Sequence, residues 1–301
     1  MKAEAEHRAG FVAILGPPNA GKSTLLNRLL GQKLAIVSRK PQTTRSRILG
    51  ICNTEGAQVM FVDTPGLHEG TRPLNQALNE AVEEAARDCD LALLLVDPTE
   101  GWMPAHAQLQ ADLAERGTPY LVVGTKDDLR GQGKRRVQWR GPWPPPEATG
   151  ACGSCWVSAR TGEGVESLLA DVARRLPESP PLYPEDAFTD KSMRWLAGEL
   201  VREAVFERLS QELPYGMAVD VVEYNEDRPD LVHIRANLLV ERNSQKRIVI
   251  GRGGEMIKGI GVRARKAIEK LVGNHVHLEL FVKIDPRWLK NAKRIESLGY
   301  H

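Results

Sequence analysis

The segment FVAILGPPNAGKS, residues 11–23, restricts the possible folds of this 301-residue chain more than any other segment. Five apolar residues precede a turn with the spacing G-x-x-x-x-G-K-[ST], whose fixed positions are Gly16, Gly21, Lys22 and Ser23. The apolar run predicts a strand, and the residues from about Gly21 onward predict a helix. A glycine turn between a strand and a helix directs backbone N–H groups toward a bound phosphate. The segment therefore predicts an α/β domain that binds a nucleotide.

The two residues that end this motif carry most of its chemistry. Lys22 is expected to place its charge on the β- and γ-phosphates, and Ser23 to offer its hydroxyl to Mg²⁺. A glycine turn with only a structural role would explain the glycines but not a lysine followed by a serine. The whole loop is included in the predicted nucleotide site: Gly16, Pro17, Pro18, Asn19, Ala20, Gly21, Lys22, Ser23 and Thr24.

A second phosphate-proximal segment is AQVMFVDTPG, residues 57–66, which predicts a strand followed by Asp63, Thr64, Pro65 and Gly66. Asp63 is expected in the Mg²⁺ shell, through a water molecule, and the N–H of Gly66 could bind the γ-phosphate. All four residues after the strand are included in the predicted nucleotide site.

The polar loop PQTTR, residues 41–45, supplies the third part of the phosphate site. Thr44 is the natural candidate to close on Mg²⁺ when the third phosphate is present, and Thr43 is the competing choice that the sequence leaves open. The predicted Mg²⁺ ligands are thus Ser23, Thr44 and Asp63, and the predicted catalytic residues are Lys22, Thr44 and Gly66.

Two later segments indicate which nucleotide base the site accepts, guanine or adenine. TPYLVVGTKDDL and CWVSARTGEGVESLL each contain an apolar strand that ends in polar residues. These ends resemble the base-reading N-K-x-D and S-A elements of the translation-factor-related GTPases. The resemblance implies that Asp128 accepts hydrogen bonds from guanine N1–H and the exocyclic amine, that Lys126 lies along the base, and that the Ala159 N–H meets guanine O6. The predicted base site comprises Thr125, Lys126, Asp128, Ser158, Ala159 and Arg160.

Thr125 stands where that family pattern has asparagine. A hydroxyl can replace part of the hydrogen bonding that the amide makes to the phosphate loop. The expected result is weaker nucleotide binding with unchanged specificity.

The first half of the chain predicts a doubly wound α/β domain with its ligand at the C-terminal ends of the strands. Its strands are expected near residues 11–15, 48–52, 57–62, 90–96, 119–124 and 155–158, with helical segments between them. The stretch 130–153 contains Trp and Pro where a helix would be expected, and it predicts an irregular surface excursion.

PESPPLYPEDAFTD, residues 177–190, is proline-rich and acidic, and it predicts a linker between domains 1–176 and 191–301. Beyond it, helical periodicity covers 192–212, and strand patterns cover 217–224 and 231–242. A short helix is expected to end near residue 250, followed by a helix over 255–272 and a strand over 275–284. The predicted order is α-β-β-α-α-β.

Gly251-Arg252-Gly253-Gly254 joins the two later helices as a G-x-x-G loop. The dinucleotide fingerprint G-x-G-x-x-G would need glycine at Met256 and a strand in front of the loop, so it fails on both counts. The pattern matches a type II KH domain, whose bare glycine loop lets the backbone approach about four single-stranded nucleotides. The predicted RNA-binding residues are Lys246, Arg247, Ile250, Gly251, Arg252, Gly253, Gly254, Ile257 and Lys258.

Charge supports this interpretation. Residues 241–270 contain nine Lys/Arg and three acidic residues, a local balance of +6, whereas the whole chain has a formal charge of +2. Such a basic segment attracts a polyanion. A degenerate KH fold that contacts protein is the alternative, and the charge argues against it.

Composition limits the cellular setting. Hydrophobic residues make up 42% and charged residues 27% of the chain, which is ordinary for a soluble protein of two domains. The N-terminal MKAEAEHRAG does not resemble a signal peptide, and no apolar run approaches the roughly 20 residues that cross a bilayer. Four cysteines fit a reducing cytoplasm, and the single C-x-x-C of Cys152 and Cys155 lacks the second pair that a zinc site needs.

A single phosphate loop followed by one KH domain, with GPPNAGKS, PQTTR, DTPG, TKDD, SAR and VIGRGG in this order, closely resembles the Era family of bacterial GTPases, of the TrmE–Era–Der group. The resemblance implies an α/β doubly wound P-loop GTPase domain followed by an α+β type II KH domain. It also implies binding of GTP, GDP and Mg²⁺, and binding of single-stranded rRNA near the 3′ end of the small ribosomal subunit's RNA. Assistance in assembly of the 30S particle is implied as well, by a monomeric cytoplasmic protein with peripheral membrane association.

Two other functions fit parts of the pattern. A nucleotide-independent RNA-binding adaptor with a vestigial GTPase domain is opposed by the intact Lys22, Ser23, Asp63 and Asp128. An RNA-dependent ATPase is opposed by Asp128 and by Ser158-Ala159.

The expected hydrolysis is slow. Leu67 follows Gly66 at the position where Ras-like enzymes carry a glutamine that orients the attacking water. No obvious general base lies nearby, because His68, the one candidate, fits a surface residue better. With Asn19, the phosphate loop resembles that of GTPases that recruit K⁺ in place of an arginine finger. The ion would neutralise the charge that develops on the phosphate.

Overall fold

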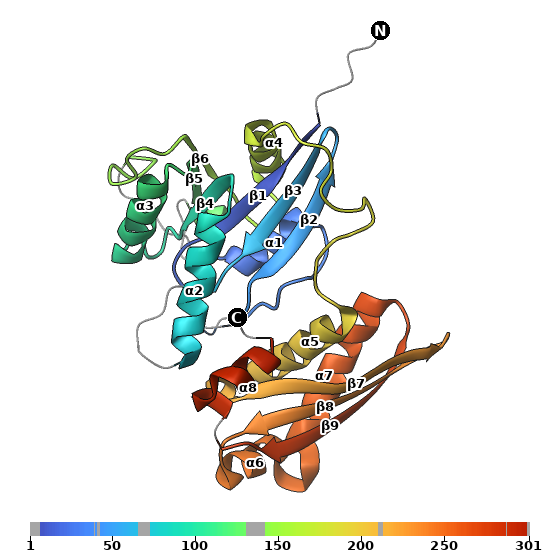
Figure 1. Ribbon diagram of the computed structural model, residues 1–301. Coiled ribbons are helices and arrows are strands. Elements are labelled where there is room, and N and C mark those ends of the chain that lie inside the picture. The colour runs from blue at the N-terminus through green and yellow to red at the C-terminus, as the bar shows by residue number, and fades with distance from the viewer. Residues whose placement is uncertain are drawn as a thin grey trace. The chain divides into compact units, whose positions relative to one another are not determined.

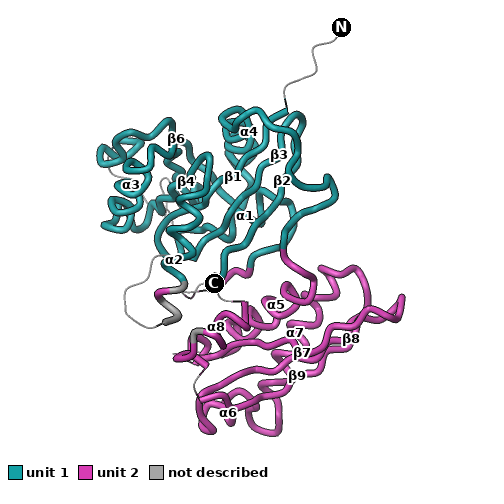
Figure 2. The backbone as a smooth tube through the Cα atoms, in the orientation of Figure 1, with its two compact units in different colours: residues 1–35, 44–69, 78–190 teal, residues 36–43, 70–77, 191–301 magenta. Residues whose placement is uncertain are grey.

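The computed structural model describes residues 7–38, 40, 43–65, 73–130, 142–209, 213–286 and 288–299. The chain divides into two compact units (Figure 2). Unit 1 comprises residues 1–35, 44–69 and 78–190, and unit 2 comprises residues 36–43, 70–77 and 191–301. Each unit has a sheet and a core of its own.

Unit 1 is built on a six-stranded sheet in the order β2-β3-β1-β4-β5-β6 (Figure 1). The strands are β1 (Arg8–Leu15), β2 (Ile48–Thr54), β3 (Ala57–Asp63), β4 (Leu91–Val96), β5 (Tyr120–Gly124) and β6 (Gly153–Trp156). The edge strand β2 is antiparallel to β3, and the other neighbours are parallel. Every residue of β3, β4 and β5 is buried, as expected for strands covered on both faces.

The helices of unit 1 complete the doubly wound α/β fold that the sequence predicts. They are α1 (Lys22–Leu29), α2 (Pro73–Arg87), α3 (Pro104–Arg116) and α4 (Val165–Arg175). Apolar residues of α2 and α3 share one core cluster with β1, β4 and β5. Helices α1 and α4 contact each other and also contact β1 and β3.

Several expected strand boundaries of unit 1 differ from the structure. Strand β1 begins at Arg8, three residues before the expected start, and β2 ends at Thr54, two residues after the expected end. The last strand was expected at 155–158, but β6 runs from Gly153 to Trp156. The chain leaves the sheet after Trp156 because the N–H of Ser158 donates to the carbonyl of Glu163, at 2.9 Å, and closes a short loop.

The expected irregular excursion agrees with the residues described there. Residues 131–141 lie outside the described part, and residues 142–152 contain no helix or strand. Trp143 packs on Trp156, with ring centroids 4.1 Å apart, and the guanidinium of Arg130 lies 4.4 Å from the centroid of Trp156. The excursion is thereby anchored to β6.

The proline-rich segment 177–190 belongs to unit 1 and is bound along its sheet. The N–H groups of Ala9 and Ile51 donate to the carbonyls of Pro177 and Phe188, at 3.2 and 2.9 Å. The buried Gln58 side chain donates to the Tyr183 carbonyl at 2.9 Å and accepts from the N–H of Leu182 at 2.7 Å. These bonds fix the segment beside β1, β2 and β3.

Unit 2 has the order α-β-β-α-α-β that the sequence predicts, followed by one more helix. The elements are α5 (Met193–Arg208), β7 (Ala218–Arg228), β8 (Leu231–Val240), α6 (Asn243–Ile250), α7 (Glu255–Val272), β9 (His275–Ile284) and α8 (Ala292–Ser297). In the sheet β7-β8-β9, the central strand β8 is antiparallel to β7 and parallel to β9. Short 3₁₀ turns occur at 127–129, 213–216, 252–254 and 288–290.

The core of unit 2 lies between its sheet and its two longest helices. Buried apolar residues of α5 and α7 form one cluster with alternate residues of β8 and β9; they include Val201, Ala204, Val232, Ile234, Ile260, Ala264, Ile268, Val276 and Val282. This is the KH arrangement, with the glycine loop between α6 and α7. No helix in the described residues is both long and apolar enough to span a membrane.

Candidate nucleotide site and nucleic-acid groove

The phosphate loop follows β1 and wraps around the lysine that the sequence singles out. Gly16 and Gly21 have positive φ angles of 148° and 99°, and a Cβ at Gly16 would lie 3.0 Å from the Leu95 carbonyl, so the loop needs glycine there. Lys22 Nζ donates to the carbonyls of Gly16 and Pro17, each at 2.9 Å. Burial lowers the pKa of Lys22 to about 8. A phosphate bound in the loop would supply the charge that favours the protonated amine.

Three oxygen donors meet beside the phosphate loop. Ser23 Oγ lies 2.7 Å from Asp63 Oδ2 and 2.8 Å from Thr44 Oγ1, and Thr44 Oγ1 lies 3.4 Å from the same carboxylate oxygen. Thr43 points elsewhere, because its hydroxyl donates to the Lys40 carbonyl at 2.7 Å. The structure thus places Thr44, and not Thr43, beside Ser23 and Asp63, the other two predicted Mg²⁺ ligands.

The Asp63 carboxylate fits a cation in this cluster. Its Oδ1 atom is buried and has no hydrogen-bond partner among the described residues. Burial raises the pKa of Asp63 to about 6, and the hydrogen bond from Ser23 opposes this shift. A hard cation such as Mg²⁺ prefers oxygen ligands of this kind and would restore the charged form. Ser23, Thr44 and Asp63 are the residues that would hold the ion, whose charge would offset that of the phosphates.

The segment after β3 is described only in part. The hydroxyl of Thr64 donates to the Ile14 carbonyl at 2.9 Å and ties this segment to β1, and Pro65 follows it. Gly66, predicted to be catalytic, lies outside the described residues, as do Leu67 and His68. Their roles stay predictions.

Five of the six predicted base-reading residues line one cavity, and the sixth, Ser158, lies behind it. Its volume is about 200 Å³, and its lining residues are Gly21, Thr24, Leu25, Thr125, Lys126, Asp128, Leu129, Val157, Ala159 and Arg160. Asp128 Oδ1 accepts from Ser158 Oγ at 2.7 Å, and Arg160 Nη1 lies 3.4 Å from Asp128 Oδ2. Ser158 therefore orients the carboxylate that the resemblance assigns to guanine.

Thr125 makes the contact expected of its hydroxyl. It is 4% exposed, and its Oγ1 donates to the carbonyl of Ala20 in the phosphate loop at 2.8 Å. A second carbonyl, that of Val96, lies 3.3 Å from the same atom. Threonine thus connects the base-reading segment to the phosphate loop with a single O–H, where an asparagine amide could donate two hydrogen bonds.

Two residues of this site were missed by the sequence reasoning. Asp97 follows β4 and pairs with Lys126 Nζ, fixing the lysine beside the cavity. The sequence could have indicated Asp97, because it directly follows an apolar strand, as Asp63 does. Arg28 on α1 donates from Nε and Nη2 to the carbonyls of Ala159 and Arg160, both at 2.9 Å, and the sequence gives no sign of a contact over this separation.

The glycine loop of unit 2 exposes its backbone. Gly251, Gly253 and Gly254 have φ angles of 76°, 59° and 82°. A Cβ at Gly253 or Gly254 would meet no atom of the protein within 4 Å, whereas one at Gly251 would lie 2.6 Å from the Met256 Cβ. The last two glycines therefore leave room for another molecule, and Gly251 is required by packing within the fold.

A groove of about 390 Å³ lies beside this loop, between α7 and β9. Its lining residues are Ile257, Lys258, Gly261, Val262, Arg265, Val276, His277, Leu278 and Leu280. Of the predicted RNA-binding residues, Ile257 and Lys258 line the groove. The sequence reasoning did not include the others, although Gly261, Val262 and Arg265 share the helix face of Ile257 and Lys258.

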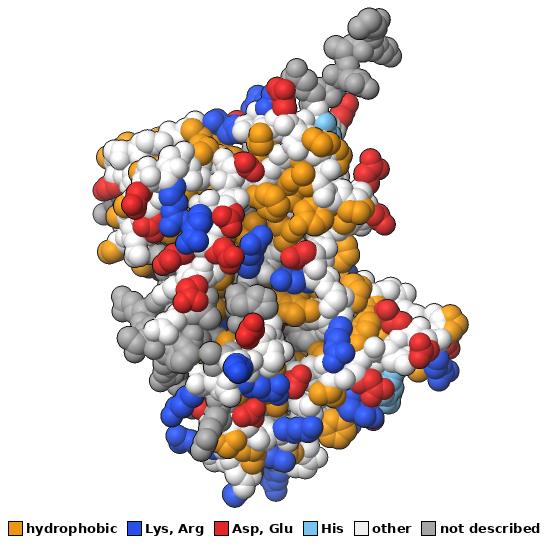
Figure 3. Space-filling model, in the orientation of Figure 1, with side chains coloured by type: hydrophobic (Ala, Val, Ile, Leu, Met, Phe, Trp, Pro, Cys, Tyr) orange, Lys and Arg blue, Asp and Glu red, His pale blue; other side chains and the backbone are white. Residues whose placement is uncertain are grey.

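The remaining predicted RNA-binding residues lie on α6 and in the loop. Lys246 and Arg247 belong to α6, and Arg252 is exposed in the loop. Ile250 is half-buried and packs against the core of unit 2, so it offers less surface than expected. Lys and Arg side chains gather over the α6 end of unit 2 (Figure 3). Arg263, by contrast, forms a two-bond ion pair with Glu207 of α5, both bonds being 2.7 Å long.

Family models match both units. A model described as a 50S ribosome-binding GTPase matches residues 11–126, and a KH-domain model matches residues 212–289. GTPase Era of Geobacter metallireducens is 43% identical over 298 residues, covering 97% of this chain and 98% of that relative. GTPase Era of Pseudomonas putida is 42% identical over 294 residues, covering 97% of each.

Two solved structures are similar over almost their whole length. Aquifex aeolicus Era, as a variant bound to GDP and AlF4⁻, is 35% identical with a TM-score of 0.89, covering 97% of this chain and 99% of that chain. Era in complex with MgGDPNP and nucleotides 1506–1542 of 16S ribosomal RNA is 36% identical with a TM-score of 0.88, covering 98% and 99%. Since this likeness runs through both units, the chain belongs to the Era family of GTPases.

Proposed function

We propose that this GTPase binds single-stranded RNA from the 3′ region of the small-subunit rRNA and uses GTP binding and hydrolysis to assist assembly of that subunit. One observation carries the proposal: a cavity lined by Lys126 and Asp128 beside a phosphate loop, and a groove of apolar and basic residues beside a glycine loop, occur in one chain. A relative that is 36% identical is described in complex with MgGDPNP and nucleotides 1506–1542 of 16S rRNA, which supports the same pair of ligands here.

In unit 1, the residues act by binding and by charge. Asp128, oriented by Ser158, would accept the hydrogen bonds that distinguish guanine from adenine. Lys22 would leave its two carbonyl partners for the phosphates, and its ammonium would stabilise the negative charge that develops during phosphoryl transfer.

Hydrolysis is proposed to be slow without an activator, because the chain carries Leu67 where a water-orienting glutamine would follow Gly66. Asn19 has a positive φ of 63° in the phosphate loop, and we assign to it the binding of K⁺ as a second source of positive charge. Turnover in KCl should then exceed turnover in NaCl. Equal rates in the two salts would remove the potassium role without affecting the GTPase.

In unit 2, the exposed backbone of Gly253 and Gly254 would admit a sugar-phosphate chain, while Ile257, Val262 and Leu280 offer apolar surface to unstacked bases. Lys258 and Arg265 line the same groove and would pair with phosphates. The basic segment 241–270 supplies the longer-range attraction.

The cellular setting is proposed as well: a monomer that acts on the 30S particle in the cytoplasm and associates peripherally with the membrane. The local charge of +6 supports the membrane association and the RNA contact alone, because a basic segment attracts anionic lipid headgroups as well as RNA.

A single set of titrations tests the function. GTP, GDP and ATP are titrated against the chain, and an RNA of the sequence of nucleotides 1506–1542 is then titrated in the presence of GDP or GDPNP. Guanine nucleotides should bind, ATP should not, and RNA affinity should differ between the two nucleotide states. RNA binding without nucleotide binding would indicate an adaptor, and preference for ATP would indicate an ATPase.

A further inference from the structure

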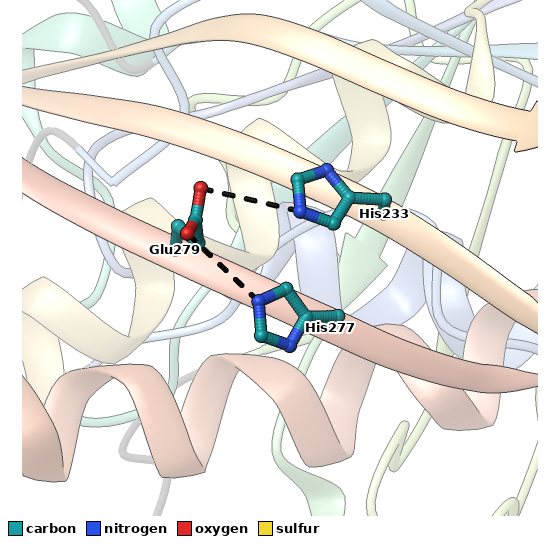
Figure 4. A group of neighbouring side chains, drawn as sticks. All are labelled: His233, His277 and Glu279. Atoms are coloured by element: carbon teal, nitrogen blue, oxygen red, sulfur yellow. Dashed lines mark ion pairs between the residues drawn. The ribbon is translucent and has the colours of Figure 1, made fainter.

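The outer face of the unit 2 sheet carries two histidines and a glutamate that point toward one another (Figure 4). His233 of β8 and His277 of β9 are direct neighbours in the parallel register, as are Arg235 and Glu279. Val232 and Val276 lie in the core, so by the alternation of a strand His233, His277 and Glu279 point away from it. The two imidazole rings are stacked, with centroids 5.0 Å apart.

The distances between the nitrogen and oxygen atoms of this group leave room for a metal ion between them. His233 Nε2 lies 4.0 Å from Glu279 Oε2, and His277 Nε2 lies 3.9 Å from Glu279 Oε1. Both separations are too long for hydrogen bonds. Around a tetrahedral Zn²⁺, with bonds of about 2.0–2.2 Å, neighbouring ligand atoms are about 3.4 Å apart. All three donor atoms already lie within 4.8 Å of one another. His277 is exposed and His233 and Glu279 are partly exposed, so small shifts of these side chains would bring the three donors to one ion.

Neighbouring charged residues orient these donors. Glu223 Oε1 lies 3.4 Å from His233 Nδ1, on the opposite side of the ring from Nε2. A carboxylate at the second nitrogen is the usual partner of a metal-binding histidine. Arg235 donates to Glu279 Oε2 at 2.8 Å and lies 3.2 Å from Glu223 Oε2, which leaves Glu279 Oε1 available.

We propose that His233, His277 and Glu279 bind one divalent transition-metal ion of the Zn²⁺ type, separate from the Mg²⁺ site of unit 1. Imidazole nitrogen favours zinc, copper or nickel over Mg²⁺ and Ca²⁺, whose preferred ligands are oxygen atoms. His277 is 56% exposed, so water can occupy the remaining coordination position. The proposed site shares no residue with the GTP site, and it shares His277 with the lining of the groove assigned to RNA. Zn²⁺ binding is measured without RNA, so its outcome does not depend on the RNA assignment.

The test uses the full chain without a histidine tag, in a Cys152→Ser/Cys155→Ser background that removes the only C-x-x-C pair of the sequence. Zn²⁺ is titrated by calorimetry with GDP and excess Mg²⁺ present, and Co²⁺ is followed by its visible absorption. One ion should bind per chain. His233→Asn and His277→Asn should each weaken binding at least about tenfold, and Glu223→Gln, outside the ligand set, about ten- to a hundredfold.

His275→Asn is the matched control, because His275 is exposed on the same strand and lies outside the cluster. It should bind Zn²⁺ as the parent does, and circular dichroism should show that all variants are folded. A folded parent that binds no Zn²⁺ would overturn the proposal. So would binding that survives in His233→Asn and His277→Asn at the strength of the control.

Discussion

Replacing Asp128 by asparagine should change the preferred base of the cavity from guanine to xanthine. The Asp128 side chain is 15% exposed, and Ser158 holds one of its oxygens at 2.7 Å, so the carboxylate cannot simply turn away from the base. The asparagine oxygen can still accept from guanine N1–H, so guanine would lose one hydrogen bond to a charged acceptor, worth about 1.5–3 kcal/mol, and its exocyclic amine would face an NH₂ donor and stay unpaired, at a further cost of about 1–3 kcal/mol. The combined loss of about 2.5–6 kcal/mol corresponds to GTP affinity about 60- to 20,000-fold weaker.

Xanthine carries a carbonyl where guanine carries its amino group, and the asparagine amide can donate to that oxygen. Titration of GTP and XTP labelled with a fluorescent group gives both affinities. Asp127→Asn is the matched control, because Asp127 pairs with Arg130 and does not line the cavity. Unchanged GTP affinity in Asp128→Asn would refute the assignment, and so would the loss of both nucleotides in a folded variant.

Three further changes test other parts of the structure. Gly253→Asp should abolish binding of single-stranded RNA in a filter-binding assay and leave GTP affinity nearly unchanged, because it adds bulk and negative charge where the backbone is open. Gly273→Asp is the control in the same assay, because Gly273 also has a positive φ and open space around it. Burial lowers the pKa of His106, whose Nδ1 accepts from the Met103 N–H at 2.8 Å. The folded chain therefore binds fewer protons at His106 than the unfolded chain does. The free energy of unfolding, measured with urea, should fall as the pH drops below 6.5, and this fall should be smaller in His106→Leu. Thr125→Asn should slow GDP release about 2- to 10-fold, because the amide can donate two hydrogen bonds and the hydroxyl donates one; an unchanged rate in stopped flow would count against this account of Thr125.

The sequence predicted those parts of the fold whose chemistry is local. The strand, turn and lysine of residues 11–23 are consecutive, so their spacing alone indicates the phosphate loop. The bounds of α7 and β9 agree with the predicted ranges because helical and strand periodicity are strong there. The strand β6 was misplaced by two residues, since only four residues form it and the next residue, Val157, is also apolar and buried.

What could not be predicted depends on contacts between distant residues. Arg28 lies 131 positions before Ala159, and no pattern relates them. The choice between Thr43 and Thr44 depends on which hydroxyl the loop turns toward Ser23, and that is a property of the folded backbone. The groove of unit 2 was missed on its β9 side for the same reason, because a helix face and a strand form it together.

Strand β9 is an edge strand: it pairs with β8, and no other strand of the described sheet pairs with it. Its free edge borders the groove, where Val276, Leu278 and Leu280 are among the lining residues. An edge strand presents a row of main-chain N–H and C=O groups, which every residue except proline supplies in the same form. Any base contact made by this row is therefore insensitive to point substitution, and mutation can alter it only by shifting the strand or introducing proline. Evolutionary change in base preference would have to come from the opposite wall, through α7 residues such as Val262 and Arg265.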